Sequence, residues 1–344
     1  MSSSVEKSSG TQSLLTGQNV VYAGIAWAVI SLLFFLLFSV SSPGEERPLW
    51  YMIGTYLLEL LPFLAGAFLC YRNWRSPNIA SGRNVWLGIG LGMLCYFIGG
   101  LLFGVWELYW HLNADVSPAD LFYLLVYAFV GWGMVLAILP RRLNLETWQW
   151  VTVVAIALLG IALAVWVYLI TPDSSQEADV VASPTATEQT TAAKSTKSTA
   201  SKAPAIKGSA SVATTAGAEE NDKKNAPDWA IAIEEALNPL AVPVNLSYII
   251  GDVFLLIIAA TLLLAFWGGR FVQSWRMIAA ATISLYIADM WTKYAASDPQ
   301  YESGGLLDVF YVFSGVLFAI GAALEFDISI RSRRGSRKRT EGRS

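Results

Sequence analysis

The sequence predicts an all-α, polytopic membrane protein with eight transmembrane helices in two tandem four-helix units. Its composition indicates the class: 55% of the residues are hydrophobic, only 14% are charged, and the mean hydropathy is +0.49. A helix needs about twenty apolar residues to cross a hydrocarbon core, so eight such helices occupy about half of the 344 residues. The polar regions hold too few apolar residues to bury a core, which excludes nucleic-acid enzymes, secreted disulfide scaffolds and soluble catalytic domains.

Eight apolar segments define the expected spans, and each has the length of a membrane-crossing helix. The first is too long for the apolar core of a signal peptide, so we expect it to be retained. The segments cover residues 20–40, 50–71, 85–108, 119–139, 149–170, 246–267, 275–294 and 306–325. The expected organisation is a polar N-terminal tail (1–19), a first four-helix unit (20–140), a cytoplasmic loop (141–148), a fifth helix (149–170), a disordered extracytoplasmic linker (171–245), helices six to eight (246–327) and a basic cytoplasmic tail (328–344).

Basic residues gather in the loops that lie on one side of an eight-span chain. The loops after spans two, four and six and the C-terminal tail hold fourteen Lys and Arg residues, against Arg47 and Lys293 in the opposite short loops. Because cytoplasmic loops carry the excess of positive charge, both termini are predicted to be cytoplasmic, in the plasma (inner) membrane. The tail from Arg331 to Arg343 is expected to fix this orientation and to bind anionic lipid.

The 171–245 linker is predicted to be disordered over most of its length. Its middle consists mainly of Ser, Thr, Ala and Lys, and so few large apolar residues cannot offset the entropy of ordering. Near its end, residues 228–237 have the pattern of a short helix that starts at Asp228 and stops before Pro239. This helix either lies on the membrane surface through Trp229 and its apolar neighbours or forms transiently within a tether.

The two sides of the linker resemble each other, which predicts a duplication. We expect two tandem units of four helices, and because each unit has an even number of spans, an axis along the membrane normal relates them. The matching segments are Tyr51-Met-Ile-Gly54-Thr55 with Tyr248-Ile-Ile-Gly251-Asp252, and Asp120-Leu-Phe-Tyr123 with Asp308-Val-Phe-Tyr311, followed by Gly133 and Gly321 at the same spacing.

Two of these segments also resemble a known family. Ser117-Pro-Ala-Asp120-Leu-Phe-Tyr123 and its counterpart Gly304-Gly-Leu-Leu-Asp308 are similar to the multi-helix membrane sensory modules that precede GGDEF-type diguanylate cyclases in bacteria. The resemblance covers spans two to four and six to eight and implies a sensing role. Nothing resembling a cyclase follows span eight, so the implied output is a partner protein. The same residues also make a good helix N-terminus, with Ser117 as the cap and Asp120 at the positive end of the dipole.

Ionisable residues inside spans are candidate functional residues, because each costs about 2.5 to 3.5 kcal/mol at a helix centre. The predicted ligand or proton site consists of Glu59, Glu107, Asp252, Asp289 and Lys293. Glu59 lies near midspan beside a proline, and the others lie toward the extracytoplasmic ends, where they would line one cavity suited to a small cationic or polar ligand. A structural alternative is that the outer side chains reach water and that Asp289 and Lys293, four residues apart, neutralise each other.

Tryptophans and glycines predict how the spans sit in the bilayer. Tryptophans at span ends, Trp86, Trp148 and Trp275 among them, predict an interfacial belt. Six glycines in span three predict close helix approach, which would make it the most buried helix. Cys70 and Cys95 lie in apolar segments and are expected to be free thiols.

These features favour a non-enzymatic sensory or scaffolding module without cofactor or metal. His111 is the single histidine, so no nucleophile, base and metal set can be assembled. The alternative is a secondary transporter of a small polar or cationic solute, which the tandem repeat and the midspan Glu59 favour. The expected partners are the lipid bilayer, anionic lipid at the basic tail and a cytoplasmic signalling partner; no nucleic acid is expected.

Overall fold

A computed structural model describes residues 16–40, 47–112, 116–139, 146–170, 226–266, 272–295 and 303–341, with side chains to residue 330. Every regular element in these ranges is helical, as an apolar environment requires, because a helix pairs its own backbone N–H and C=O groups. The polar N-terminal tail, the loop at 140–145 and linker residues 171–225 lie outside the described residues, so the disorder predicted for the linker stays a prediction.

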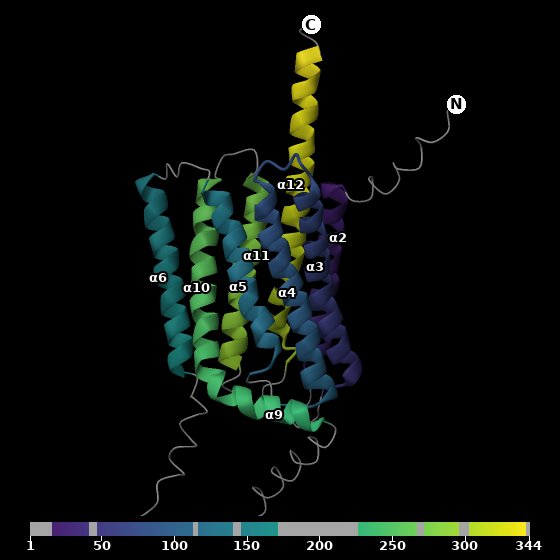
Figure 1. The fold of residues 1–344 in the computed structure, drawn as a ribbon, viewed down its shortest axis with the longest axis vertical. Helices are drawn as coiled ribbons and strands as arrows, with labels where there is room; N and C mark the ends of the chain where they lie inside the picture. Colours follow the sequence, from purple (N-terminus) through teal and green to yellow (C-terminus); the bar gives the residue numbers. More distant parts are fainter. Residues whose placement is uncertain are drawn as a thin grey trace, which may run out of the picture.

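Eight long helices form the bundle, in agreement with the eight predicted segments (Figure 1). Seven of them are long and apolar enough to cross a membrane by themselves. The chain is therefore a multi-pass membrane protein. The helices are α2 (Gly17–Phe38), α3 (Leu49–Arg75), α4 (Arg83–Gly104), α5 (Ala119–Ile138), α6 (Thr147–Ile170), α10 (Ala241–Ala265), α11 (Val272–Ala295) and α12 (Val309–Glu341).

The helix that is too polar to qualify alone, α11, runs through the bundle beside the others. Half of its 24 residues are buried, several of them Ser, Thr or Tyr, and it packs between α10 and α12. A helix that faces other helices needs less apolar surface than one that faces lipid. Its polarity is therefore a consequence of its inner position.

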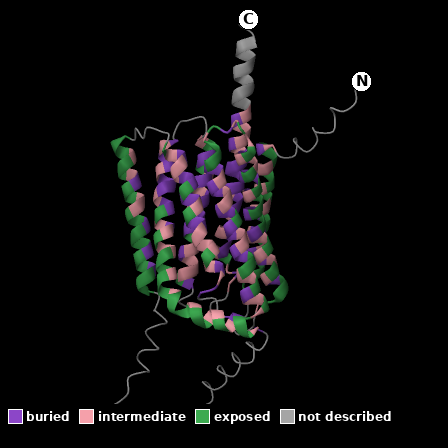
Figure 2. Cartoon of the chain, in the orientation of Figure 1, coloured by how far each residue is buried: buried purple, intermediate pink, exposed green. Residues whose placement is uncertain are grey.

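Six helices pack in a closed ring in the order α3, α4, α5, α10, α11 and α12, with α12 returning to α3. The remaining two lie outside the ring, α2 against α12 and α6 against α10, and both are largely exposed (Figure 2). The most buried spanning window belongs to α12, at 67%, against 50% for α4 and its extension. The prediction that span three is the most buried helix was therefore wrong: α12 contacts α2, α3 and α11, so it is surrounded on more sides.

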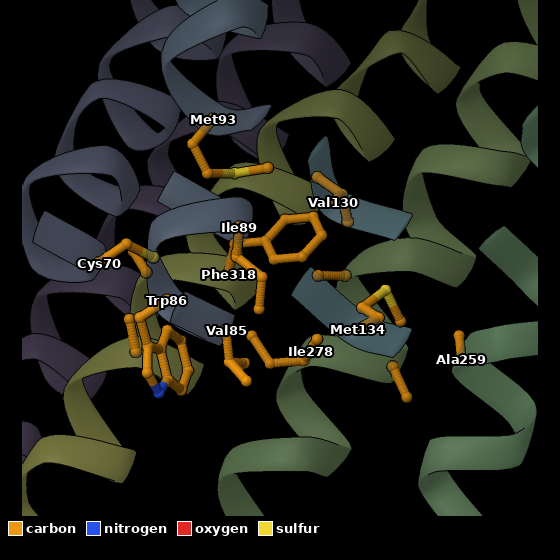
Figure 3. Packing of buried hydrophobic residues seen from close by; sticks show 14 of the residues in the cluster. Cys70, Val85, Trp86, Ile89, Met93, Val130, Met134, Ala259, Ile278 and Phe318 are labelled. Carbon is orange, nitrogen blue, oxygen red and sulfur yellow. The ribbon is translucent and has the colours of Figure 1, made fainter. Parts of the chain in front are cut away.

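One end of the ring, where α3 ends and α4 begins, is packed with large apolar side chains that are shielded from solvent. Ile89, Phe318, Met134 and Ile278 meet there from four different helices (Figure 3). Trp86 and Trp275, predicted to belong to an interfacial belt, are fully buried in this core with ring centroids 6.1 Å apart. That part of the belt prediction was wrong, whereas Trp148, half exposed, lies at the surface as expected.

Close helix approach in this core depends on small residues. A Cβ added to Gly88 would lie 2.8 Å from the Cα of Gly133, so α4 and α5 touch through their backbones. Gly133 lies against the carbonyl of Val85, and Gly321 on α12 lies in the same way against the carbonyl of Ser274 on α11. A duplication predicts such matched contacts. The duplication itself stays a prediction that these contacts support.

The two faces of the bundle differ. The first helix begins and α12 leaves the ring on the same face, which also carries Arg72, Arg75 and Arg83 and is called the basic face below (Figure 1). The opposite face is covered by the short helix α9 (Asp228–Leu237) and is called the α9 face. α9 packs through Ala230 and Ile231 on Trp106 and Leu112, and the Trp110 and Trp229 rings meet edge to face at 5.1 Å.

Two predicted boundaries need correction. The linker was expected to extend to residue 245, but α9, the 3-10 turn η4 (Asn238–Leu240) and the first turn of α10 already occupy residues 228–245. The short helix itself ends at Leu237, before Asn238-Pro239, as predicted, and Pro239 then stands in the first turn of η4, where it has no N–H to satisfy. The basic tail was expected to begin at 328, but α12 continues to Glu341, since Arg and Lys favour helices and no proline interrupts them.

Candidate functional site

A cluster of carboxyl groups and tyrosines fills the ring toward the α9 face. The structure brings four predicted residues, Glu59, Asp252, Asp289 and Lys293, into this cluster from α3, α10 and α11, and places Glu107 at its edge. The helices bring these side chains together from positions up to 234 residues apart in sequence, between Glu59 and Lys293.

The centre of the cluster is a pair of aspartates on neighbouring helices. The Tyr127 hydroxyl on α5 lies 2.8 Å from Oδ1 of Asp252 and 3.1 Å from Oδ2 of Asp289. Tyr311 on α12 donates to Oδ1 of Asp289 at 2.9 Å and contacts the Thr292 hydroxyl at 3.0 Å. Four helices therefore meet at two carboxyl groups.

Asp252 is 2% exposed, and its Oδ2 atom has no donor among the described residues. The Asp252 and Asp289 carboxyl groups lie close together, because the same Tyr127 hydroxyl is within hydrogen-bond distance of both. An uncompensated carboxylate oxygen is costly in a buried site, so this atom requires a proton or a cation. This unsatisfied oxygen points to a ligand more directly than the number of acidic residues does.

Lys293 places a positive charge beside the pair. Its ammonium lies 4.7 Å from the centroid of the Tyr248 ring, and its charge acts on Asp252, Asp289 and Asp120. The structural alternative, in which Asp289 and Lys293 neutralise each other four residues apart on α11, stays a prediction beside the ligand site. The arrangement of a carboxylate and an aromatic face around an ammonium is how proteins hold organic cations.

Asp120 has two roles. One oxygen accepts a hydrogen bond from the backbone N–H of Ser117 at 2.6 Å, which confirms its predicted place at the N-terminus of α5. The other oxygen accepts from the Tyr248 hydroxyl on α10 at 2.5 Å, which joins it to the cluster. Asp308, which corresponds to Asp120 in the second predicted unit, accepts hydrogen bonds in the same way from the N–H groups of Gly304 and Gly305, directly before α12.

Glu59 forms a separate tyrosine–carboxylate pair across the ring from the aspartates. The Tyr96 hydroxyl on α4 donates to its Oε1 atom at 2.6 Å, and the Tyr96 ring stacks on Phe63 at 3.7 Å. Pro62 lies within α3 one turn from Glu59 and removes a backbone N–H there. Glu59 therefore lies in the interior of α3, where its Oε1 atom accepts a hydrogen bond from Tyr96.

Glu107 lies on a π-helical turn, η2 (Val105–Tyr109), that ends α4. The Tyr56 hydroxyl on α3 donates to Glu107 at 2.5 Å, while Trp106 turns the other way and packs under α9. A π-helical turn adds a residue to the helix and is frequent at functional sites. Because of this turn, Glu107 reaches the cluster while the adjacent Trp106 packs against α9.

Tyr123 occupies the middle of the cluster. Its hydroxyl makes no hydrogen bond within the described part of the chain, and the carboxyl groups of Glu59, Asp120 and Asp289 lie near it. Tyr123, Asp289 and Lys293 are half-buried side chains inside the ring.

Sequence reasoning found Glu59, Glu107, Asp252, Asp289 and Lys293 but missed Asp120 and the tyrosines as site residues. The available signal was helical spacing: Tyr248 precedes Asp252 by four residues, and Tyr123 precedes Tyr127 by four. Each pair lies on one face of an otherwise apolar helix, a polar stripe that indicates an inward face. The partner of each hydroxyl depends on a different helix and was not accessible from spacing.

The chemistry of the site is that of cation or proton binding. Cys70 and Cys95, both buried free thiols as expected, lie in the chain away from these contacts. In the ranges that the structure describes, no group of three His, Cys, Asp or Glu side chains is arranged to hold a metal ion. In comparisons with known proteins, no family model, no curated protein and no solved structure matches this chain.

Proposed function

We propose that this protein is a non-enzymatic sensory module that binds a small organic cation in the carboxylate–tyrosine cluster and transmits binding through α12. The observation that carries the proposal is the course of α12. It starts at the cluster, directly after Asp308 and with Tyr311 on its first turn, and continues as one helix to Glu341. Its 33 residues span about 50 Å, against about 30 Å of hydrocarbon, so one helix joins the site to the solution beyond the basic face.

The ligand class follows from charge and aromatic surface. Asp252, Asp289 and Asp120 outnumber the Lys293 ammonium, so the cluster disfavours anions. Tyrosine faces beside carboxylates favour an ammonium group, and Lys293 already holds one in such a position over Tyr248. The Lys293 ammonium is thus an internal stand-in for the ammonium of a ligand.

The packing of the basic-face half favours sensing over transport. Trp86, Ile89, Met134, Phe318 and Ile278 are completely buried there and belong to one apolar core. A transporter must open this half in part of its cycle. A sensor needs only a rigid element that crosses it, which α12 provides.

Orientation completes the proposal. The positive-inside rule places the basic face in the cytoplasm and the α9 face outside the plasma membrane. Residues 331–341 of α12 would then be available to an output partner, as the resemblance to sensory modules implies, and their Arg and Lys residues to anionic lipid. Protease added to intact cells should cut within 185–225; protection of this linker would overturn the orientation.

The test uses the full chain in lipid nanodiscs. Two spin labels, on cysteines introduced at Asn84 and Ser336, measure the distance from the ring to the projecting part of α12, while Cys70 and Cys95 are buried from the label. A control pair at Asn84 and Arg276 lies within the basic face. Methylammonium and tetramethylammonium should change the first distance and leave the second unchanged, and acetate should change neither.

Uptake of radiolabelled methylammonium by proteoliposomes separates the two functions. A sensory module binds and moves α12 without saturable uptake. Saturable uptake without a change in the Asn84–Ser336 distance would replace sensing by transport. Absence of both binding and movement for every cation in the panel would overturn the ligand class.

A further inference from the structure

The Asp252–Asp289 pair has fewer hydrogen-bond donors than its oxygens require. Tyr127 has one hydroxyl proton, so at any moment it donates to Asp252 or to Asp289 but not to both. Tyr311 supplies a second proton, to Oδ1 of Asp289. Asp252 Oδ2 is left without a donor from the described side chains.

The pair also has fewer positive charges around it than two ionised carboxylates require. Lys293 supplies one positive charge to Asp252, Asp289 and Asp120. Asp120 is also held by the N-terminus of α5, through the Ser117 N–H, which leaves the two aspartates to share one ammonium. None of the other titratable groups around the pair adds a positive charge. They are Tyr248 on α10, Tyr286 on α11, Tyr123 and Tyr127 on α5, Tyr311 on α12, Asp308 directly before α12, and Glu59 on α3.

We propose that Asp252 and Asp289 share one proton when the site is empty, and that an ammonium ligand releases this proton when it binds. This inference rests on the proposed function, because it takes a small organic cation as the ligand. In the empty site the shared proton occupies Asp252 Oδ2 and bridges the two carboxyl groups, which both satisfies the oxygen and removes one negative charge.

The exchange balances in atoms and charge. The carboxyl O–H bond breaks, the proton leaves to water on the α9 face, and N–H groups of the ammonium form hydrogen bonds to the two carboxylates. One positive charge replaces another, so the site keeps its net charge while the ligand gains the full attraction of two ionised aspartates. The tethered Lys293 remains in place and the mobile proton is the cation that leaves.

Linkage gives a quantitative expectation. If one proton leaves for each ligand that binds, the apparent Kd for methylammonium falls about tenfold for each unit of rise in pH, as long as the empty pair holds its proton. Above the pH at which the empty pair loses that proton, the dependence disappears. A cation that binds without proton exchange shows no such slope.

The experiment is calorimetric titration of the nanodisc protein with methylammonium in buffers of different ionisation enthalpy, between pH 6 and pH 8. The expected result is about one proton released per bound ion and the tenfold slope. Asp252→Asn should abolish both, because the amide brings its own N–H donor to Asp289 and holds no exchangeable proton. Asp289→Asn does the same from the other side and serves if Asp252→Asn fails to fold.

Glu325→Gln is the matched control. Glu325 is a fully buried carboxyl group on α12 that accepts from Ser81 near the basic face, away from the pair. This variant should keep the proton release and the slope. Methylammonium binding without proton release would overturn the inference and leave the sensory proposal standing, whereas absence of binding in the unmodified protein would overturn both.

Discussion

The two halves of the six-helix ring are built from the same helices but bury opposite kinds of side chain. Toward the basic face, Trp86, Phe318 and Met134 form a core without accessible space. Toward the α9 face, Asp252, Asp289 and Tyr127 occupy equivalent interior positions, and one carboxylate oxygen stays unsatisfied. The half toward the basic face is dominated by apolar packing, with Glu325 and Asn73 as buried polar exceptions, whereas the polar half retains several groups whose burial is unfavourable.

This difference separates stability from function. Within a bilayer, helices associate through close packing, because lipid tails compete equally for apolar surface. The backbone contact between Gly88 and Gly133 supplies such packing in one half. Buried carboxyl groups stabilise a bundle no more than apolar packing would. We therefore expect the carboxyl groups of the polar half to serve binding. Substitutions in the two halves should therefore differ in kind.

The largest effect is expected in the apolar half. Gly88→Ala places a Cβ 2.8 Å from the Cα and 2.9 Å from the N of Gly133, where backbone cannot yield, and should destabilise the protein by about 3 kcal/mol. Gly66→Ala is the control, because its Cβ would meet nothing closer than Met93 Cγ at 3.6 Å, an ordinary van der Waals contact. Thermal unfolding in nanodiscs measures both. Equal melting temperatures would show that the α4–α5 contact is not tight.

Glu59 tests the polar half. Glu59→Leu leaves the Tyr96 hydroxyl without its acceptor and should cost about 1 to 3 kcal/mol of stability. Glu59→Gln keeps an acceptor for Tyr96 but removes the charge, so it should keep stability near that of the unmodified protein and abolish the movement of α12 on cation binding. A fully responsive Glu59→Gln variant would assign Glu59 to structure alone. Tyr96→Phe with Glu59→Leu should recover part of the lost stability.

The α9 cover is expected to show a smaller effect. Trp229→Ala removes an edge-to-face contact with Trp110, worth about 0.5 to 1.5 kcal/mol, and should loosen α9 without unfolding the ring. Amide hydrogen exchange should rise at residues 228–237 and remain unchanged in α4. Trp148→Ala, at an exposed tryptophan on α6, is the control and should leave α9 as it is. Unchanged exchange in Trp229→Ala would mean that α9 does not depend on this contact.

The smallest effect is expected from the linker. Deletion of residues 185–215 removes mainly Ser, Thr, Ala and Lys, whose composition does not support a packed structure. The free energy of unfolding should therefore change by less than about 0.5 kcal/mol. Thermal unfolding of the deletion variant beside the full chain measures this. A clear loss of stability would show that the linker packs on the bundle.

The sequence by itself determined the helices and the face on which α2 begins and α12 leaves the ring. A helix pairs its own backbone N–H and C=O groups, so an apolar segment of sufficient length becomes a spanning helix whatever its neighbours are. Because the number of such helices is even, the start of α2 and the end of α12 lie on the same face. The cost of charge in lipid likewise marked Glu59, Asp252 and Asp289 before any packing was known.

Only the tertiary structure decided which side chains meet. The burial of Trp86 and Trp275, the docking of α9 and the sharing of Tyr127 between two aspartates all depend on which faces of distant helices pack together. Those choices arise from close contacts of a few ångströms between segments separated by more than a hundred residues, and the period of a single helix carries no information about its neighbour. The polar stripe on each helix was in the sequence, but the site it forms exists only in the ring.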